Sequence, residues 1–192
     1  MGSAQTFFGA FLRAPGAIGA VFPSSAALAR KMIEACDIRP GHVVAELGAG
    51  TGPVTRALAD LAGVSVVALE PDPVLAAACR LAAPSIPVEE AFAQDLSAVL
   101  ARHGHAGCER VVSSLPFAGW PADLQDAVMD GILGALAPGG RMVTFTYMHS
   151  PWLPAGGRAR ALLERRFATV QTTSMVWGNL PPAFVYVCDK AG

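Results

Sequence analysis

The sequence predicts an α/β protein with a doubly wound, mostly parallel sheet of seven strands. Two observations carry this prediction. From about residue 40, short β-branched runs alternate with periodic segments rich in Ala and Leu, the pattern of a parallel sheet with crossover helices. Beyond residue 147, two consecutive strand-like runs indicate a hairpin at one edge of the sheet. The length of 192 residues fits one domain, so residues 1–192 are expected to fold as a single unit.

The elements follow in order along the chain. Ser24 and Ser25 are predicted to cap a helix over residues 26–35. Strands are expected at residues 43–47, 64–69, 86–89, 111–114 and 142–147. Helices are expected between them at residues 53–61, 73–82, 96–102 and 123–136. Pro138, Gly139 and Gly140 end the last of these helices. A helix at residues 158–166 and strands at 168–177 and 182–188 complete the fold.

Charge and cysteine usage exclude several kinds of partner. The formal net charge is -1, and the 14 basic residues are scattered apart from a group at residues 158–166. A protein that tracks phosphates concentrates positive charge on one face, so no nucleic acid partner is predicted. The four cysteines form no CxxC pair, so we expect packing roles, no metal site and a reducing cytoplasm.

The first 24 residues have a character of their own. A short amphipathic helix is expected there. Its apolar side is formed by Phe7, Phe8, Phe11 and Leu12, and the cation Arg13 follows directly. One interpretation packs this helix across the domain. The other inserts it into a lipid interface, where each buried large side chain contributes about 1.5–3 kcal/mol. Prolines interrupt the apolar stretch of residues 14–30, so no membrane-spanning helix is expected there.

The strongest local motif is a strand that runs into a glycine-rich turn. The turn residues are Gly48, Ala49, Gly50, Thr51 and Gly52. Glycine allows the sharp bend and lets a ligand approach the main chain, and the following helix start offers free amides. A dinucleotide-binding turn has the spacing GxGxxG, whereas this one reads GxGxG after an acid, Glu46. That acid suits a ligand whose amino-acid end and sulfonium are cationic.

Two more acids follow the next two strands. Glu70, with Pro71 beside it, is predicted to accept both ribose hydroxyls of a nucleoside. Asp95 is predicted to accept from an adenine amino group. Parallel strands end at one edge of a sheet, so Glu46, Glu70 and Asp95 are expected around one ligand. The pattern predicts a class I, Rossmann-like methyltransferase that converts S-adenosyl-L-methionine to S-adenosyl-L-homocysteine, with solvated surface acids as the alternative.

A turn after the fourth strand is the candidate acceptor site. Ser114 and Leu115 are predicted to point backbone carbonyls at an amine, and Ser114 also to lie against the cofactor. Pro116, Phe117 and Trp120 are predicted to wall the pocket. The alternative is an ordinary strand-to-helix turn with buried aromatic rings. The motif favours an amino acceptor over a hydroxyl.

Tyr147 and His149 end the fifth strand, where alternation directs both to the same side. We predict that His149, or the Tyr147 phenol through water, assists proton removal; the alternative is a wall residue and a surface histidine. Converting an alkylamine to its neutral form costs about 4 kcal/mol at pH 7, because the pKa of its ammonium form is near 10. Alignment of the reactants gains on the order of 7–11 kcal/mol. Positioning is therefore expected to supply most of the catalysis.

With these motifs in place, the chain resembles the small bacterial phospholipid N-methyltransferases, which are related to the rRNA adenine dimethylases. The matching segments are residues 11–13, 19–25, 46–52, 114–117 and 179–183. The resemblance implies stepwise methylation of phosphatidylethanolamine and its mono- and dimethyl derivatives toward phosphatidylcholine. Phe22 and Asn179, within or beside the matching segments, are expected to contact the lipid acceptor, and Tyr147 to contact its methylated product by cation–π attraction. For Ser24 and Ser25, binding of the lipid phosphate is the alternative to helix capping.

The expected enzyme is cytoplasmic and peripheral to the inner face of the cytoplasmic membrane. Its partners are the phospholipid substrate and a membrane surface with anionic lipid. Arg13, Arg30 and Lys31 are expected to supply positive charge toward that surface, with plain solvated residues as the alternative. A monomer is expected in solution. Residues 1–24 are expected to touch the membrane and cover the cofactor. Two alternatives stay open: an RNA adenine N-methyltransferase, and a catalytically dead lipid-binding protein with this fold.

Overall fold

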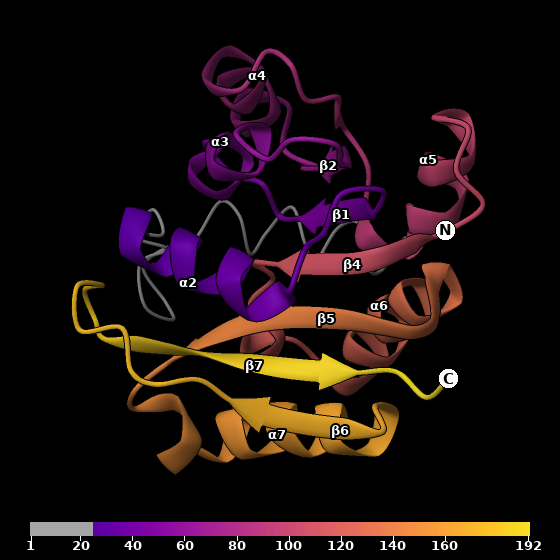
Figure 1. Cartoon of the computed structure of the whole chain (residues 1–192). Helices are drawn as coiled ribbons and strands as arrows, with labels where there is room; N and C mark the ends of the chain where they lie inside the picture. Colours follow the sequence, from indigo (N-terminus) through magenta and orange to yellow (C-terminus); the bar gives the residue numbers. More distant parts are fainter. Residues whose placement is uncertain (1–24) are drawn as a thin grey trace.

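The computed structural model describes residues 25–192 and contains one seven-stranded sheet in the order β3-β2-β1-β4-β5-β7-β6 (Figure 1). β7 is antiparallel to both of its neighbours, and the other pairings are parallel. The doubly wound, mostly parallel sheet predicted from the sequence is thus confirmed. The predictions outside the described residues concern Phe7, Phe8, Phe11, Leu12, Arg13, Phe22 and Ser24.

The order of the strands creates a topological switch point at the carboxyl edge of the sheet, where a ligand crevice is expected. The strands are β1 (Val43–Leu47), β2 (Ser65–Leu69), β3 (Val88–Glu89), β4 (Cys108–Ser113), β5 (Leu136–Tyr147), β6 (Thr169–Thr172) and β7 (Ala183–Asp189). The chain winds from β1 outward to β3 and then returns to β4 on the other side of β1. At such a switch point the loops after β1 and β4 separate, which leaves room for a ligand.

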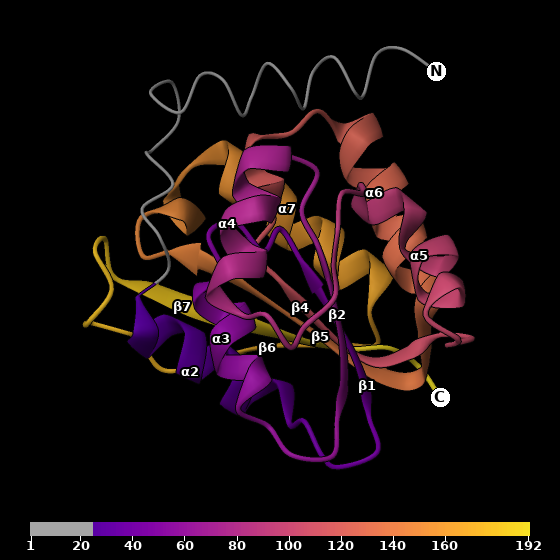
Figure 2. The same cartoon turned by 90° about the horizontal axis from the view of Figure 1, so that it is seen from above.

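Helices cover both faces of the sheet (Figure 2). They are α2 (Ala26–Cys36), α3 (Pro53–Ala59), α4 (Pro73–Ala82), α5 (Leu96–Arg102), α6 (Ala122–Ala135) and α7 (Pro154–Arg166). α2 and α3 pack on one face with α4 against α3, while α5, α6 and α7 pack on the other. Within residues 25–192, no helix combines the length and hydropathy that crossing a membrane requires.

Several element boundaries differ from the prediction. β3 is shorter than expected, because only Val88 and Glu89 pair with β2. The strand predicted at residues 168–177 ends as β6 at Thr172, since the Thr173 hydroxyl takes over and accepts the Val185 N–H at 3.1 Å. Pairing of β5 with β4 already begins at Leu136, before the turn at 138–140 that was expected to separate helix and strand, and its register shifts there.

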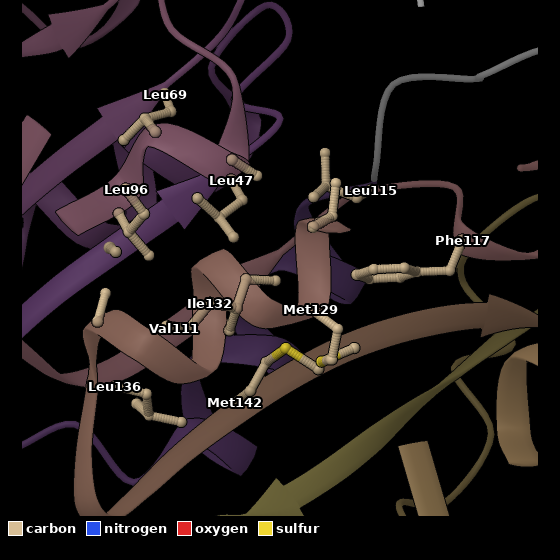
Figure 3. Close-up of a cluster of buried hydrophobic side chains, with 14 of the residues drawn as sticks. Leu47, Leu69, Leu96, Val111, Leu115, Phe117, Met129, Ile132, Leu136 and Met142 are labelled. Carbon is tan, nitrogen blue, oxygen red and sulfur yellow. The ribbon is translucent and has the colours of Figure 1, made fainter. Parts of the chain in front are cut away.

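The larger core lies between the sheet and the helices α5, α6 and α7 (Figure 3). Alternate residues of the central strands, such as Leu47, Val111 and Met142, meet Met129 and Ile132 of α6 there. Period-two alternation in the strands and an apolar stripe on the helix make this contact possible. The predicted packing role of the cysteines is confirmed, because all four thiols are buried.

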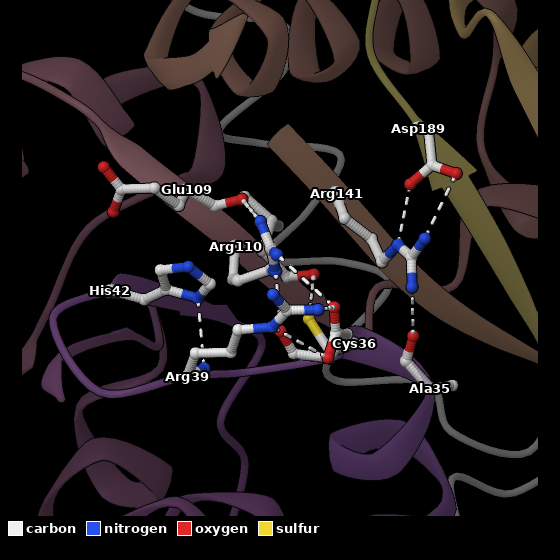
Figure 4. A network of polar contacts seen from close by, with 10 residues as sticks. Ala35, Cys36, Arg39, His42, Glu109, Arg110, Arg141 and Asp189 are labelled. Atoms are coloured by element: carbon white, nitrogen blue, oxygen red, sulfur yellow. Dashed lines mark hydrogen bonds and ion pairs between the residues drawn. The ribbon is translucent and has the colours of Figure 1, made fainter. Parts of the chain in front are cut away.

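A polar network fastens the end of α2 to the opposite, amino-terminal edge of the central strands (Figure 4). Arg141 of β5 pairs with Asp189 of β7 at 2.7 Å and donates to the Ala35 carbonyl at 3.2 Å. Arg110 of β4 donates to the Asp37 carbonyl at 3.1 Å. Charge-assisted bonds of this kind are stronger than neutral ones. The network therefore holds the helix whose other end reaches the carboxyl edge.

Candidate active site

The glycine-rich turn leaves β1 and bends toward β2. The N–H groups of Gly48 and Ala49 both donate to the Leu69 carbonyl, at 2.9 and 3.2 Å. Gly48, Gly50 and Gly52 have φ values of +74°, +56° and +85°, which cost a residue with a Cβ about 1–2 kcal/mol. Gly52 is the N-cap of α3. The turn therefore ends at the free amides of a helix start.

A side chain added at each of these glycines would meet a different environment. A Cβ on Gly48 would lie 3.1 Å from Cδ2 of Leu115, and one on Gly52 would lie 3.2 Å from Sγ of Cys79. A Cβ on Gly50 would meet nothing within 4 Å. Gly48 thus contacts the loop after β4, Gly52 packs on α4, and Gly50 borders open space where a ligand can approach the backbone.

Glu46 is an acid buried at the carboxyl end of β1. Within residues 25–192, neither carboxyl oxygen meets a donor in hydrogen-bonding geometry. Burial raises the pKa of Glu46 to about 8; the Thr55 hydroxyl lowers it in part and the Glu70 carboxyl raises it. The Thr55 hydroxyl also lies 3.1 Å from Sγ of Cys79. The hydroxyl and N–H of Thr55 lie near this carboxyl but outside full hydrogen-bonding geometry, so its burial costs free energy that a cationic ligand group can offset.

Glu70 follows β2 and is already bound to the main chain. Its Oε2 accepts the Gly50 N–H at 2.9 Å, and its Oε1 accepts the Asp72 N–H at 3.0 Å. Burial raises the pKa of Glu70, while these two N–H groups lower it in part. Pro71, the next residue, is half-buried. Glu70 therefore fixes the glycine-rich turn, and each oxygen retains lone pairs for the predicted ribose hydroxyls.

Asp95 stands at the N-cap of α5 with an exposed side chain. The turn that carries it, Ala93–Asp95, rests on α6 at Gly131, where an added Cβ would lie 2.7 Å from Cα of Gln94. The strands β1, β2 and β3 are adjacent in the sheet; Glu46 lies near the end of β1, Glu70 directly follows β2, and Asp95 ends the short turn between β3 and α5. Their contact with a cofactor stays a prediction, as does that of the buried Ala49 and the exposed Thr51.

The turn after β4 is built from backbone groups. The Ser114 N–H donates to the Leu47 carbonyl at 2.8 Å, and the Leu115 N–H donates to Oγ of Ser113 at 3.3 Å. The Leu115 carbonyl accepts the Phe117 N–H at 3.0 Å, whereas the Ser114 carbonyl receives no hydrogen bond from a described residue. Ser114 therefore has the more available of the two carbonyls predicted to face an amine.

The aromatic residues of this turn lie in the core. Phe117 and Trp120 are buried, with ring centroids 5.5 Å apart in an edge-to-face arrangement. Figure 3 shows Leu115 and Phe117 at the border of the large core cluster, beside Met129. This arrangement matches the alternative interpretation of the turn, and Pro116 beside them is half-buried. Contact of Pro116, Phe117 and Trp120 with an acceptor stays a prediction.

Gln125 of α6 supports the turn and was missed in the sequence. Its side-chain nitrogen donates to the Phe117 carbonyl at 2.7 Å and to the Trp120 carbonyl at 3.0 Å. The side chain is buried, so these two bonds form away from water. The signal was a polar residue on the apolar face of a helix, between Leu124 and Val128. Gln125 therefore fixes the loop that carries the open carbonyl.

Tyr147 and His149 lie on the same side, as predicted. Their ring centroids are 6.0 Å apart and the ring planes are parallel. Phe145 contacts Tyr147 edge-to-face at 5.7 Å. Burial raises the pKa of the half-buried Tyr147, whereas His149 is exposed. Their role in proton removal stays a prediction.

The first turn of α2 is tied to the loop before β7. Oγ of Ser25 accepts the Leu28 N–H at 3.2 Å, which confirms the predicted cap. The Ser25 N–H donates to Oδ1 of Asn179 at 3.1 Å, and Nδ2 of Asn179 donates to the Pro181 carbonyl at 2.8 Å. Asn179 thus has a structural role in which both ends of its amide are used. Contact of Ser25 or Asn179 with an acceptor stays a prediction.

The fold and this edge together define a class I S-adenosylmethionine-dependent methyltransferase. Comparisons with known proteins identify the family. Residues 17–89 match the ribosomal RNA adenine dimethylase family. Over 187 residues the chain is 34% identical to an ornithine lipid N-methyltransferase of Singulisphaera acidiphila, covering 95% of this chain and 93% of the relative. The chain therefore belongs to the family of S-adenosylmethionine-dependent methyltransferases that includes this lipid N-methyltransferase. S-adenosyl-L-methionine is its cofactor.

Solved structures share the fold at low sequence identity. The N-methyltransferase NodS from Bradyrhizobium japonicum has a TM-score of 0.65 and 12% identity, covering 85% of this chain and 94% of NodS. A TehB-like methyltransferase from Corynebacterium glutamicum has a TM-score of 0.62 and 16% identity, covering 98% of each chain. A 16S rRNA methyltransferase of T. thermophilus, solved with AdoMet and guanosine, has a TM-score of 0.63 and 24% identity, covering 91% of this chain and 45% of the rRNA methyltransferase.

Proposed function

We propose that this methyltransferase acts on the amine of phosphatidylethanolamine, and on its mono- and dimethyl derivatives, toward phosphatidylcholine at the inner face of the cytoplasmic membrane. The observation that carries the proposal is the identity of 34%, over nearly the whole chain, to an enzyme whose named acceptor is a lipid. The acceptor turn, residues 114–120, contains no charged side chain. That composition suits an amine that reacts in its neutral form.

The chemistry requires little beyond alignment of the acceptor. Bound S-adenosylmethionine supplies a methyl group on a sulfonium, which an amine lone pair takes by in-line displacement. A primary alkylamine has a pKa near 10, so the neutral form costs about 4 kcal/mol at pH 7. The open Ser114 carbonyl can accept an amine hydrogen and so orient the lone pair. Such alignment gains on the order of 7–11 kcal/mol, which exceeds the cost of deprotonation.

Tyr147 and His149 are the proposed route for the released proton. Because burial raises the pKa of Tyr147, its phenol stays protonated at neutral pH and can pass a proton on but not store one. His149 stacks on Tyr147 at the exposed side and can deliver the proton to water. Tyr147 is also less buried than Phe117 and Trp120, so it is the ring we assign to cation–π contact with methylated products.

A second candidate function is N-methylation of adenine in RNA. The match of residues 17–89 to the ribosomal RNA adenine dimethylases favours it. Binding of RNA by such an enzyme depends steeply on salt, because basic residues displace counterions from phosphates. Activity on RNA that falls with salt, together with none on lipid, would select this alternative.

A methyl-transfer assay separates these functions. The full-length protein is incubated with methyl-labelled S-adenosylmethionine and, in parallel, with phosphatidylethanolamine vesicles, ornithine lipid vesicles or ribosomal RNA. We expect label in phosphatidylethanolamine and its methylated derivatives, and less label with the Glu46→Gln variant at a cofactor concentration that saturates only the parent. Label in ornithine lipid alone would change the acceptor, and label in RNA alone would overturn the proposal.

The first residues are proposed to contribute to membrane binding. Deletion of residues 1–12 is expected to reduce sedimentation of the protein with vesicles, because it removes the apolar side of the predicted helix. Sedimentation equal to that of the full-length protein would contradict an interfacial role for this segment.

A further inference from the structure

Two loops outside the described cofactor and acceptor turns carry large apolar side chains in the open. One loop, residues 148–153, follows β5, and the other, residues 174–182, precedes β7. The exposed fractions are 76% for Trp152, 51% for Leu153, 72% for Trp177 and 75% for Leu180. We call these two segments the tryptophan loops. Large apolar side chains exposed on loops that lie side by side are typical of an interaction surface.

The sheet holds both loops at the edge where the methyl-transfer site lies. Tyr147 at the end of β5 pairs with Ala183 at the start of β7, and the Met148 N–H donates to the Pro182 carbonyl at 2.8 Å. Val176 forms a bridge with Ala183 from the other side. Figure 1 shows the two loops together at the left-hand end of the sheet, toward which β4 points. The tryptophan loops therefore flank the acceptor side of the crevice.

Charge is missing from both loops. Residues 148–157 and 174–184 contain no Lys, Arg, Asp or Glu, in a chain where 15% of residues are charged. The residue that follows the first of these ranges, residues 148–157, is the cation Arg158. It is exposed and has no ion-pair partner among residues 25–192. An uncharged apolar surface followed by a free cation is complementary to a bilayer, whose apolar layer lies beneath anionic phosphates.

We infer that the tryptophan loops insert into the interfacial layer of a phospholipid bilayer and turn the acceptor edge of the sheet toward the membrane. Tryptophan suits this layer because its ring is apolar while its N–H remains hydrogen-bonded at the wet boundary. The inference rests on the proposed function, since a lipid acceptor reaches the crevice with least exposure of its acyl chains when this edge meets the bilayer.

A paired set of variants tests the inference in the full-length protein. Trp152→Ala/Trp177→Ala removes the exposed rings, and Val74→Ala/Leu81→Ala removes apolar side chains that are 76% and 86% exposed on α4. Binding is measured by sedimentation with vesicles of phosphatidylethanolamine and phosphatidylglycerol. We expect the tryptophan variant to bind at least tenfold more weakly and the α4 variant to bind like the parent. Equal binding by all three proteins would overturn the inference.

Two further measurements separate folding and other partners from membrane insertion. Both variants should keep the parent's affinity for S-adenosylmethionine and its activity on a monomeric short-chain phosphatidylethanolamine, while only the tryptophan variant loses activity on vesicles. Brominated lipids should quench Trp152 and Trp177 in the parent. Absence of quenching, or loss of self-association in place of vesicle binding, would overturn the inference. Absence of lipid methylation by a parent that binds vesicles would instead overturn the proposed function alone.

Discussion

One sheet edge presents two regions of opposite chemistry. Three acids lie near or after the carboxyl ends of β1, β2 and β3, namely Glu46, Glu70 and Asp95. Behind β4, the turn at residues 114–120 offers only backbone carbonyls and uncharged side chains. The difference follows from the two ligands that methyl transfer requires. A cationic cofactor is stabilised by carboxylates, whereas a carboxylate beside the acceptor would raise the pKa of its amine and favour the unreactive ammonium form.

The two regions touch at the end of β1. The Leu47 carbonyl accepts the Ser114 N–H, and a Cβ on Gly48 would lie in tight contact with Leu115, at 3.1 Å from its Cδ2. The cofactor turn and the acceptor turn therefore depend on the same few backbone atoms. Variants that act on one region, or on the contact between them, test whether the regions have separate functions.

The largest effect is expected at the contact between the regions. Gly48→Ala adds backbone strain at φ +74° and a Cβ 3.1 Å from Leu115. We expect kcat/KM to fall more than about 100-fold, with weaker binding of both cofactor and acceptor, because the strained glycine-rich turn and the Leu115 side chain must adjust together. Steady-state kinetics and titration calorimetry measure these effects. Gly41→Ala is the control, since Gly41 has φ +90° but an added Cβ meets nothing within 4 Å. If Gly41→Ala lost as much activity as Gly48→Ala, backbone strain alone would explain the loss, and the contact with Leu115 would not be needed.

Loss of the buried acid should act on the cofactor region. In Glu46→Gln we expect cofactor affinity to fall about 10- to 100-fold, the worth of a charge-assisted hydrogen bond. The parent, whose Glu46 has a pKa of about 8, should also release a proton on binding the cationic cofactor at pH 7. Calorimetry in buffers of different ionisation enthalpy measures this proton. Equal proton release by parent and variant would show that Glu46 is not the group that releases the proton. Exposed Glu34→Gln is the control.

The same carboxyl predicts a pH dependence of stability without ligand. The folded state holds a proton that the unfolded state lacks between the ordinary pKa of glutamate and about 8. Stability from this group is therefore full below the unfolded pKa and is lost as pH rises toward 8. The Tm of Glu46→Gln relative to the parent should increase between pH 5 and pH 8. A constant difference would contradict the raised pKa.

Gln125 should act on the acceptor region alone. In Gln125→Ala, two buried hydrogen bonds to the turn are lost. We expect kcat/KM for the acceptor to fall about tenfold, with cofactor affinity unchanged. Exposed Gln171→Ala is the matched control. An equal loss of cofactor affinity would show that Gln125 supports the whole fold and not the acceptor turn.

The smallest effect is expected at Tyr147 and His149. If alignment supplies most of the catalysis, Tyr147→Phe and His149→Ala should each reduce kcat by less than about tenfold at pH 7. The pH profile of kcat for both variants measures their part in proton removal. A loss of about 100-fold or more, restored at higher pH, would identify a required base and weaken the role given to positioning.

The cofactor region was predictable because its chemistry uses residue types that stand out in a sequence. Acids that follow apolar strands, combined with glycines at GxGxG spacing, are typical of a nucleoside-binding sheet edge, and Glu46 and Glu70 lie where they were expected. The acceptor region depends on main-chain groups and on Gln125, whose contacts arise only when α6 packs beneath the sheet. The end of β6 escaped prediction for a similar reason, since a threonine hydroxyl replaces a ladder bond there.

A crystal structure of the complex with S-adenosyl-L-homocysteine tests whether the three acids surround the cofactor. We expect the amino group of the ligand within hydrogen-bonding distance of Glu46, its ribose at Glu70 and its adenine at Asp95. It also predicts that the sulfur faces the Ser114 carbonyl across the crevice. A ligand bound at another edge of the sheet, or carboxylates directed away from it, would contradict the account.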